Sequence, residues 1–291
     1  MSHYSIKDLE SLSGIKAHTL RIWEQRYHII RPKRTETNIR LYDDEDLKKI
    51  LNISVLNQNG YKISKIADMS FADITAAIIR LSQQVENFQD QIKALVISMM
   101  ELDETRFERT IWHCVQQLGM EKAMVEIVYP FLNKVGLLWQ IGTINPYQEH
   151  FVSNLIRQKL ITAIDTQLGN PVSDPKKFLL FLPDGELHEI GLLFASYILK
   201  ARGFRVYYLG QCLPFDELRN AYRLCKPDYT LTIVTSLGNG ETQELIQNLS
   251  SVLLDCIHIV AGYQLVDVHL NLPNVLLMKN VQQFIQYVDK K

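Results

Sequence analysis

The sequence predicts a multidomain protein of the α and α/β classes, with a winged helix-turn-helix, a four-helix bundle and a Rossmann-like, doubly wound parallel sheet. Three observations point to this fold class. Short helices separated by turns come first, apolar residues at helical spacing with almost no strand signal follow, and strands then alternate with helices to the end. We predict three domains, over residues 1–75, 76–174 and 175–291.

The composition suits a chain of several globular domains. Of its 291 residues 47% are hydrophobic, and 31 Lys and Arg against 32 Asp and Glu give a net charge of −1. No apolar run approaches the roughly 18 residues that a membrane helix needs, and the polar N-terminus is unlike a signal peptide. The four cysteines show no CxxC spacing, which argues against a disulfide framework and a Cys-based zinc site. We therefore expect a cytoplasmic protein.

Apolar spacing predicts four helices in the first domain. They are expected over residues 6–13, 17–27, from about 43 to 59, and 63–68. Ser5 is a candidate N-cap for the first helix, and Gly14 is placed to turn the chain before the second. Pro32 and the polar residues 35–38 indicate a loop, after which residues 39–42 return as a short extended piece.

A basic segment within this domain is hidden by the balanced charge of the whole chain. From Ser13 to Arg40 seven positive residues outnumber two negative ones, a local net charge of +5. In a winged helix-turn-helix the second helix can enter the major groove of DNA, and basic residues after it can reach phosphates. Charge alone is equally compatible with an ordinary solvated surface.

The run SGIKAHTLRIWEQRYHIIRPKRTETNIRLYDDEDL favours DNA binding, because residues 3 to about 70 resemble the DNA-binding domain of the MerR family of transcription regulators. His28 and Asn38 depart from the family, which often has Gly at both sites; Asn tolerates positive φ, so the wing turn is expected to survive. The resemblance implies a DNA interface made by these residues: His18, Thr19, Arg21 and Arg26 on the recognition helix, and Lys33, Arg34 and Arg40 on the wing.

The same resemblance implies a dimer on a palindromic, double-stranded operator, and so an association with the bacterial nucleoid. Trp23 is expected in the core of the domain rather than against DNA. Tyr27 and Tyr42 are compatible with either place.

The second domain is predicted to be a helical bundle. Apolar residues recur at spacings of three and four from residue 78 to 99, and further helices are expected over 102–118, 121–139 and 148–166. Gly169, Asn170 and Pro171 break the pattern, and residues 172–177 have the composition of a linker.

The third domain is predicted to be a parallel sheet covered by helices. Short apolar runs predict strands over residues 178–182, 204–209, 229–235, 257–261 and 275–278. Helices are expected over residues 186–202, 215–225, 242–254 and 281–289. Such alternation produces right-handed βαβ units.

His188 lies just after the first of these strands, where open α/β sheets bind ligands. A neutral imidazole suits a soft or borderline metal ion, and the nearby Glu186 could hold the other ring nitrogen. The alternative is a surface histidine in the first turn of a helix. Elsewhere Trp139 is followed after nine residues by Glu149 and His150, and Gly262 follows the fourth strand, where it would let a ligand approach the backbone.

Together these residues resemble a cobalamin-binding module over residues of about 80 to 285. Its loop motif DxHxxG corresponds to Glu186, His188 and Gly191, and the pair formed by Trp139 and Glu149-His150 is similar to the light-sensing CarH/LitR group of MerR-type repressors, which use adenosylcobalamin. The resemblance implies that His188 is the lower axial ligand of cobalt, that Trp139 packs against the adenosyl group, and that Glu149 hydrogen-bonds its ribose.

The resemblance also implies a light response. After the Co–C bond breaks, His150 would become the upper ligand of cobalt, the homo-oligomer (dimer or tetramer) would come apart, and DNA would be released. The chain is then a repressor and not an enzyme.

Three residues depart from the usual pattern of the module, two of them where it binds the tail of the cofactor. Glu186 replaces Asp, Thr232 or Ser236 stands for the usual Ser on the third strand, and Ala261-Gly262 replaces Gly-Gly. These changes weaken tail binding more than axial ligation. They leave open a MerR-type regulator whose C-terminal half is a cofactor-free domain for oligomerisation or for a partner such as an antirepressor protein. A corrinoid carrier in methyl transfer is a third reading, and the sequence contains no P-loop, GxSxG or HExxH motif.

Overall fold

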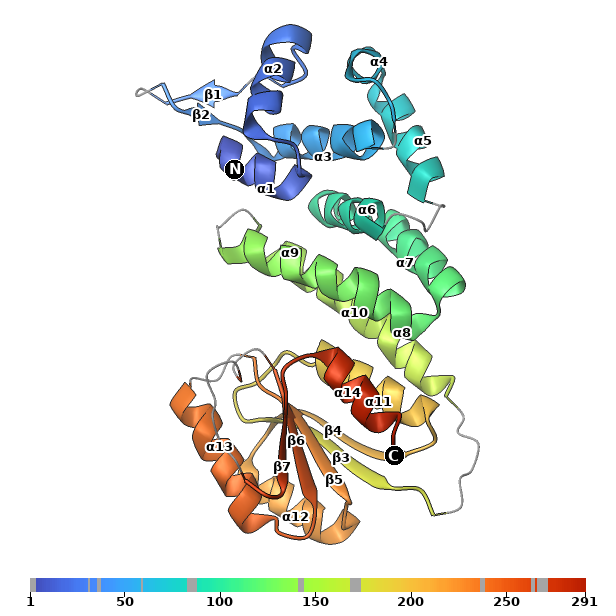
Figure 1. The fold of residues 1–291 in the computed structure, drawn as a ribbon, viewed down its shortest axis with the longest axis vertical. Helices are drawn as coiled ribbons and strands as arrows, with labels where there is room; N and C mark the ends of the chain where they lie inside the picture. The colour runs from blue at the N-terminus through green and yellow to red at the C-terminus, as the bar shows by residue number, and fades with distance from the viewer. Residues whose placement is uncertain are drawn as a thin grey trace. The chain divides into compact units, whose positions relative to one another are not determined.

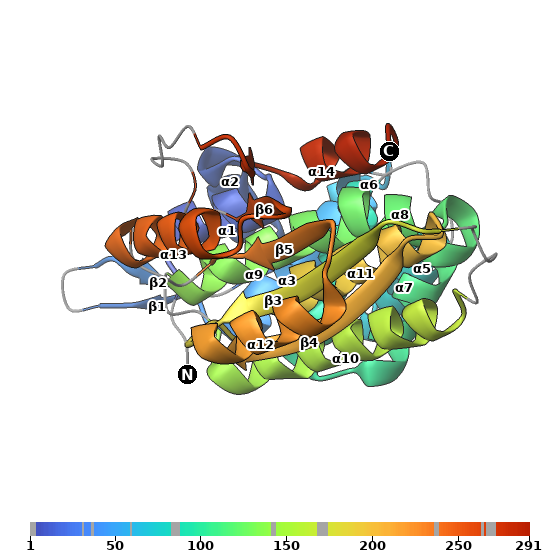
Figure 2. The same cartoon turned by 90° about the horizontal axis from the view of Figure 1, so that it is seen from below.

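The computed structural model describes residues 4–30, 32–35, 38–58, 60–82, 88–140, 144–167, 174–235, 239–262, 265 and 272–291. The chain forms two compact units, Met1–Leu155 and Ile156–Lys291. The first unit is helical apart from a two-stranded ribbon, and the second contains a parallel sheet with helices on both faces (Figure 1, Figure 2). The predicted fold class is confirmed. No helix in the described part of the chain is long and apolar enough to cross a membrane.

The first two helices begin and end where the sequence predicts. Helix α1 spans Ile6–Ser13 and α2 spans Ala17–Tyr27. Ser5 caps α1 through a capping box: its Oγ accepts from the backbone N of Asp8 at 3.3 Å, and its own N donates to Asp8 Oδ2 at 2.7 Å. Gly14 ends α1 in the left-handed conformation, with φ 74°.

The wing is an antiparallel ribbon of β1 (Lys33–Arg34) and β2 (Arg40–Leu41). The extended piece expected near residue 40 is confirmed, whereas β1 was not predicted, because two residues after a proline carry no strand periodicity. Helices α3 (Asp44–Gln58) and α4 (Ile63–Ala67) follow close to their expected places.

The rest of the first unit is a succession of helices. They are α5 (Phe71–Ser82), α6 (Phe88–Glu101), α7 (Glu104–Leu118), α8 (Met120–Ala123), the π-helical turn η1 (Met124–Val128), α9 (Tyr129–Gln140) and α10 (Pro146–Asp165). Segments α8, η1 and α9 run on without a break, in place of the single helix expected over residues 121–139. Helix α5 was not predicted as a separate helix, and it runs through residue 75.

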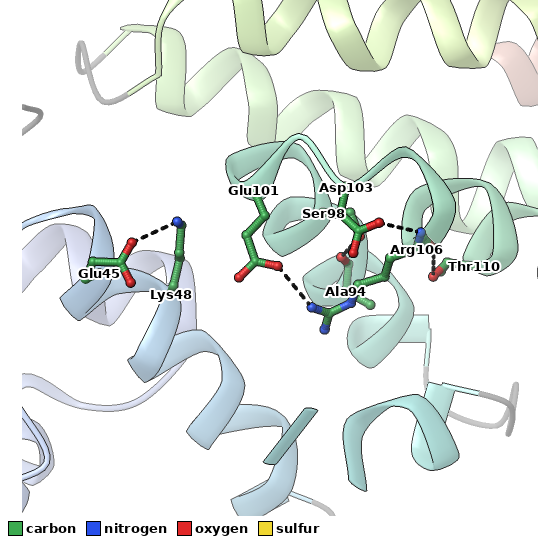
Figure 3. A network of polar contacts seen from close by, with 8 residues as sticks. All are labelled: Glu45, Lys48, Ala94, Ser98, Glu101, Asp103, Arg106 and Thr110. Atoms are coloured by element: carbon green, nitrogen blue, oxygen red, sulfur yellow. Dashed lines mark hydrogen bonds and ion pairs between the residues drawn. The ribbon is translucent and has the colours of Figure 1, made fainter. Parts of the chain in front are cut away.

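Helix α6 is the core of this unit. Its residues from Asp90 to Met100 are all buried, since α6 contacts α3 and α5 as well as α7 and α9. At its end the chain turns tightly into α7: Asp103 caps α7 by accepting from the backbone N of Arg106 at 2.9 Å, and Arg106 Nη1 lies 3.4 Å from Glu101 Oε2 (Figure 3). A helix that is buried on all sides ties the elements around it into one packed body.

The second unit has a five-stranded parallel sheet in the order β4-β3-β5-β6-β7. The strands are β3 (Lys177–Pro183), β4 (Arg205–Leu213), β5 (Tyr229–Ile233), β6 (Ile257–Ala261) and β7 (Val275–Met278). The helices are α11 (Ile190–Ala201), α12 (Phe215–Cys225), α13 (Asn239–Val252) and α14 (Val281–Val288). All five predicted strands are present.

The two faces of this sheet carry different helices. Leu179, Phe181 and Val260 pack in one apolar cluster with residues of α12 and α13. On the other face Phe178 stacks on Tyr229, which meets Tyr287 of α14 edge to face. Figure 1 shows α11 and α14 on this second face. Side chains alternate along a strand, so each face of β5 can be assigned from its register with β3 and β6.

Candidate functional site

The loop from Asp184 to Glu189 lies at the carboxyl end of the sheet, between β3 and α11. Helix α11 begins at Ile190, with Glu189 as its N-cap, and not at residue 186 as expected. His188 therefore lies in the loop before the helix, which corrects both the helix boundary and the alternative of a histidine in a first helical turn. The helix starts late because the carboxylate of Glu186 binds groups outside it.

Glu186 is a fully buried carboxylate that fixes His188. Its Oε1 lies 2.6 Å from Nδ1 of His188 and accepts from the backbone N of the same residue at 3.1 Å. Its Oε2 accepts from the backbone N of Thr235, at the end of β5, at 2.7 Å. The Glu186 side chain is 0% exposed, whereas that of His188 is 61% exposed. With Nδ1 turned toward the carboxylate, Nε2 is the ring nitrogen that can coordinate a metal ion.

Neighbouring elements hold the backbone of this loop. Gln211 Nε2 donates to the carbonyl O of Leu187, and Cys212 Sγ lies 3.7 Å from the carbonyl O of Glu186. Both residues are on β4. No local pattern in the sequence predicts these contacts, since they join segments more than 20 residues apart.

Glu189 is a second buried carboxylate beside His188. Its Oε1 accepts from Arg157 Nε of α10, and its Oε2 accepts from the hydroxyl of Tyr208 at 3.1 Å. Burial, and then the charge of Glu189, raise the pKa of Tyr208 above its ordinary value, so the phenol stays protonated and donates. Neither Arg157 nor Tyr208 was predicted as a site residue.

A second glutamate–histidine pair lies in the first unit. Oε2 of Glu149 is 3.0 Å from Nδ1 of His150, near the start of α10, and the imidazole is 71% exposed. Trp139, near the end of α9, is 52% exposed, so it is not the core tryptophan that was the alternative. The structure thus keeps Trp139, Glu149 and His150 accessible to a ligand.

The described residues include no group of three or more His, Cys, Asp or Glu side chains that could hold a metal ion. Each of the two glutamate–histidine pairs offers a metal ion one imidazole nitrogen. A single imidazole suits a metal ion that arrives with most of its ligands already bound, as in a macrocycle.

Thr232 and Gly191 lie on opposite faces of the sheet. Thr232 pairs with Val260 in the sheet, so its side chain is on the face covered by α12 and α13, whereas Gly191 is on α11, over the opposite face. Thr232 Oγ1 is buried and has no hydrogen-bond partner in the part of the chain that the structure describes. Ser236 lies outside the described residues.

Gly262 is required by the fold itself. Its φ is 133°, and a Cβ there would stand 2.0 Å from the carbonyl O of Val234. The structure thus explains this glycine by the close approach of the neighbouring chain at Val234.

The predicted recognition helix presents its basic face to solvent. His18, Arg21 and Arg26 are exposed on α2 and Thr19 is half-buried. Trp23 is buried, as predicted. Tyr42 is fully buried, and burial followed by the nearby Glu24 raises its pKa to about 12, so it belongs to the core. Tyr27 is half-buried, with the guanidinium of Arg26 5.6 Å from its ring centroid.

The wing residues divide into two groups. Lys33 and Arg34 are exposed, and Arg34 Nη1 donates to Asn38 Oδ1 at 2.7 Å across the wing turn. Asn38 has φ 64°, which confirms that this turn survives without Gly. Arg40 is half-buried, and its Nε lies 3.0 Å from Glu24 Oε2 on α2. The structure thus gives Arg40 a role in joining the wing to the recognition helix.

Two parts of the chain match known protein families. Residues 4–70 match the MerR HTH family regulatory proteins, and residues 91–163 match the B12 binding domain. The chain therefore combines a MerR HTH domain with a B12-binding domain.

Two relatives align over most of the chain, and a third aligns over about a quarter of it. The HTH-type transcriptional repressor CarH of Myxococcus xanthus is 28% identical over 257 residues, which are 86% of this chain and 85% of that protein. CarA of the same organism, also an HTH-type transcriptional repressor, is 27% identical over 263 residues, 90% of this chain and 84% of that protein. The HTH-type transcriptional regulator MlrA of Escherichia coli is 36% identical over 66 residues, covering 23% of this chain and 27% of that protein.

A solved structure shares the fold. The monomethylamine corrinoid protein of Methanosarcina barkeri superposes with a TM-score of 0.53 at 12% identity, over 70% of this chain and 100% of that one. At this identity the likeness concerns the fold alone.

Proposed function

We propose that this chain is a DNA-binding transcription repressor that senses adenosylcobalamin, and that the bound cofactor controls its oligomerisation and operator binding in response to light. The observation that carries the proposal is the pair of Glu186 and His188. A buried carboxylate that holds Nδ1 of an exposed imidazole, at the carboxyl end of a parallel sheet, leaves Nε2 as the donor to an axial position of cobalt.

Four residues are proposed to hold the cofactor. His188 is the lower axial ligand, and Glu186 orients it. The exposed ring of Trp139 offers an apolar surface to the adenosyl group, and the carboxylate of Glu149, 39% exposed, accepts hydrogen bonds from its ribose. When bound, adenosylcobalamin supplies a Co–C bond that light can break. His150 is the proposed second imidazole for cobalt, and its Nδ1 already lies beside the carboxylate of Glu149.

DNA binding is proposed for α2 and the wing. The exposed residues His18, Arg21 and Arg26, with Thr19, would enter a major groove, and Lys33 and Arg34 would bind phosphates. Arg40 would act through its ion pair with Glu24, which sets the wing against α2. A dimer or tetramer would bind a palindromic operator, since relatives named as repressors share both parts of the chain.

An absorbance spectrum tests the cofactor. The full chain, purified in the dark with adenosylcobalamin, should retain a corrinoid after gel filtration, and His188→Ala should lose it. A wild-type chain that elutes without corrinoid would refute cobalamin sensing.

The light response needs its own measurement. Illumination should change the oligomer size, measured by light scattering, and should release an operator fragment in a mobility-shift assay. If both stay the same while the corrinoid remains bound, the chain is a cobalamin sensor without a light response.

A cofactor-free regulator is the second candidate, and it is favoured by the full burial of Thr232 and by the close approach of Val234 to Gly262, the two places where the cofactor tail was expected. In that case an antirepressor or another copy of the chain would bind the C-terminal half. Normal repression in cobalamin-depleted cells would support it. A methyl-transfer carrier is a third and weaker candidate, supported by the fold of a corrinoid protein alone.

A further inference from the structure

The carboxylate of Glu189 makes two contacts, to Arg157 and to Tyr208, that have no role in the proposed function. Its side chain is 9% exposed, and both carboxylate oxygens are occupied, one by Arg157 Nε and the other by the hydroxyl of Tyr208 at 3.1 Å. A buried carboxylate with a cation and a phenol as partners has one well-defined position. The residue that it fixes lies directly after His188 in the chain.

Glu189 also stands where an acidic side chain would normally cap its own helix. It is the N-cap of α11, yet its side chain accepts no hydrogen bond from the first turn of that helix. Only its backbone takes part, with the carbonyl O accepting from the N of Leu193 at 2.9 Å. The carboxylate is turned away from α11 toward α10 and β4.

The contact to Arg157 differs from the other contacts of the loop. Thr235, Gln211 and Tyr208, which also bind the loop, all belong to the sheet or its strand ends. Arg157 belongs to α10, a helix of 20 residues that carries Glu149 and His150 near its start. Arg157 follows His150 by seven residues, about two helical turns, so both side chains lie on the same face of α10.

We propose that Arg157 is a positioning residue for the axial ligand: through Glu189 it ties α10 to the loop that presents His188. The inference rests on the proposed function, because it assumes that His188 binds cobalt. Release of Arg157 leaves the loop held by the sheet alone, so His188 samples more positions and ligates less well. Mutation of a residue that hydrogen-bonds a metal ligand typically changes metal affinity by about 10 to 100-fold. Arg157 acts one contact further from His188, through Glu189, so we expect the lower end of this range.

Electron paramagnetic resonance of the full chain tests this directly. The protein is labelled with ¹⁵N-histidine and loaded with cob(II)alamin, so that a histidine nitrogen on cobalt splits the signal into doublets, whereas the ¹⁴N of the cofactor's own base gives triplets. We expect doublets in the wild type. In Arg157→Gln we expect a mixed spectrum and an affinity lower by about tenfold, and Arg157→Lys should restore much of both.

Arg219→Gln is the matched control, since Arg219 makes an ion pair with Asp216 within the exposed part of α12, away from the loop. It should behave like the wild type. Tyr208→Phe removes the other hydrogen bond to Glu189 and should shift the spectrum in the same direction, which keeps the test valid if Arg157→Gln does not fold.

If Arg157→Gln shows the same doublets and the same corrinoid affinity as the wild type, the inference is overturned and the proposed function stays intact. A wild type without doublets, unchanged by His188→Ala, would overturn both.

Discussion

Two threonines of β5, two residues apart, differ in whether the buried hydroxyl has a hydrogen-bond partner. Thr230 Oγ1 lies 2.7 Å from Nδ1 of His258, whereas Thr232 Oγ1 is buried without a partner in the described structure. Both side chains lie on the α12–α13 face of the sheet. A buried hydroxyl costs free energy unless it is hydrogen-bonded, so the two residues should respond in opposite ways to removal of the hydroxyl.

We expect Thr232→Val to raise the free energy of unfolding of the cofactor-free protein by about 1 kcal/mol, and the control Thr230→Val to lower it by about 1–3 kcal/mol. Urea denaturation measures both. Corrinoid affinity should change by less than about twofold in Thr232→Val, which corresponds to about 0.4 kcal/mol. The reason is that the Thr232 side chain is fully buried on the α12–α13 face. A large loss of affinity would instead place the tail of the cofactor on the α12–α13 face.

His258 makes stability depend on pH. It is fully buried, and desolvation lowers its pKa below the ordinary value of 6.5, while Nε2 lies 2.8 Å from the carbonyl O of Leu253. The unfolded chain therefore binds a proton more readily than the folded one. The contribution of neutral His258 to the free energy of unfolding is therefore complete above about pH 6.5. It is lost as the pH falls from there through the lower pKa of the folded state.

In a series of denaturation curves from pH 7.5 to 4.5, the wild type should lose stability below about pH 6.5 with a slope of up to about 1.4 kcal/mol per pH unit from this group. His258→Gln should flatten that part of the curve. His18→Gln, which changes an exposed histidine, should leave the slope as it is. An unchanged slope in His258→Gln would show that other groups cause the acid sensitivity.

At the scale of elements, the end of α2 depends on backbone conformation. His28 is the C-cap of α2 and has φ 52°, in the left-handed region. His tolerates this region better than β-branched residues do, and Gly adopts it without strain. Positive φ at this position therefore explains why a Gly would suit it, a reason that sequence analysis identified for Asn38 but not for His28.

We expect His28→Val to lower the free energy of unfolding by about 1–2 kcal/mol. His28→Gly should change it by less than about 0.5 kcal/mol, because relief at positive φ offsets the greater freedom of Gly in the unfolded chain. Thermal denaturation measures both, with Gln25→Val, in the exposed helix interior, as a control that costs less than about 0.7 kcal/mol. Equal losses of unfolding free energy in Gln25→Val and His28→Val would show that positive φ at position 28 carries no special cost for Val.

The wing offers a second test at this scale, because its basic residues have different surroundings. Lys33 is 65% exposed and its Nζ lies 3.7 Å from Asp43 Oδ2, whereas Arg40 is 23% exposed and its Nε lies 3.0 Å from Glu24 Oε2. In fluorescence titrations of an operator fragment, Lys33→Gln should reduce the salt slope of binding by about 0.9 without a change in melting temperature. Arg40→Gln should lower the melting temperature as well. A loss of binding in Lys33→Gln that is independent of salt would argue against a phosphate contact.

At the scale of the whole molecule, the cofactor and the operator must affect each other equally if they are linked at all. Binding free energies are reciprocal, so a corrinoid that strengthens operator binding tenfold requires an operator that strengthens corrinoid binding tenfold, a coupling of about 1.4 kcal/mol. Titrations of the full chain with each partner, in the presence and absence of the other, should give the same factor in the dark. Two independent affinities would show that the domains share a chain but not a switch.

Several features of the fold were predictable because they depend on local spacing and on long motifs. The bounds of α1 and α2, the N-cap at Ser5, the turn at Asn38 and the five parallel strands all follow from side-chain periodicity and backbone preferences within a few residues. The candidate residues Glu186 and His188 were also recognisable, because the two stand two residues apart at the end of a predicted strand.

Contacts between groups far apart in the chain depend on how the elements pack, and local sequence does not predict them. Arg157 and Tyr208 bind Glu189 from segments 32 and 19 residues away, and Arg40 reaches Glu24 across 16 residues. Helix α11 begins at Ile190, and in the loop before it the carboxylate of Glu186 accepts from the backbone N of Thr235, two residues after β5. The opposite placement of Thr232 and Gly191 likewise follows from sheet register, which local sequence does not specify: a shift of one residue turns every side chain of a strand to the other face.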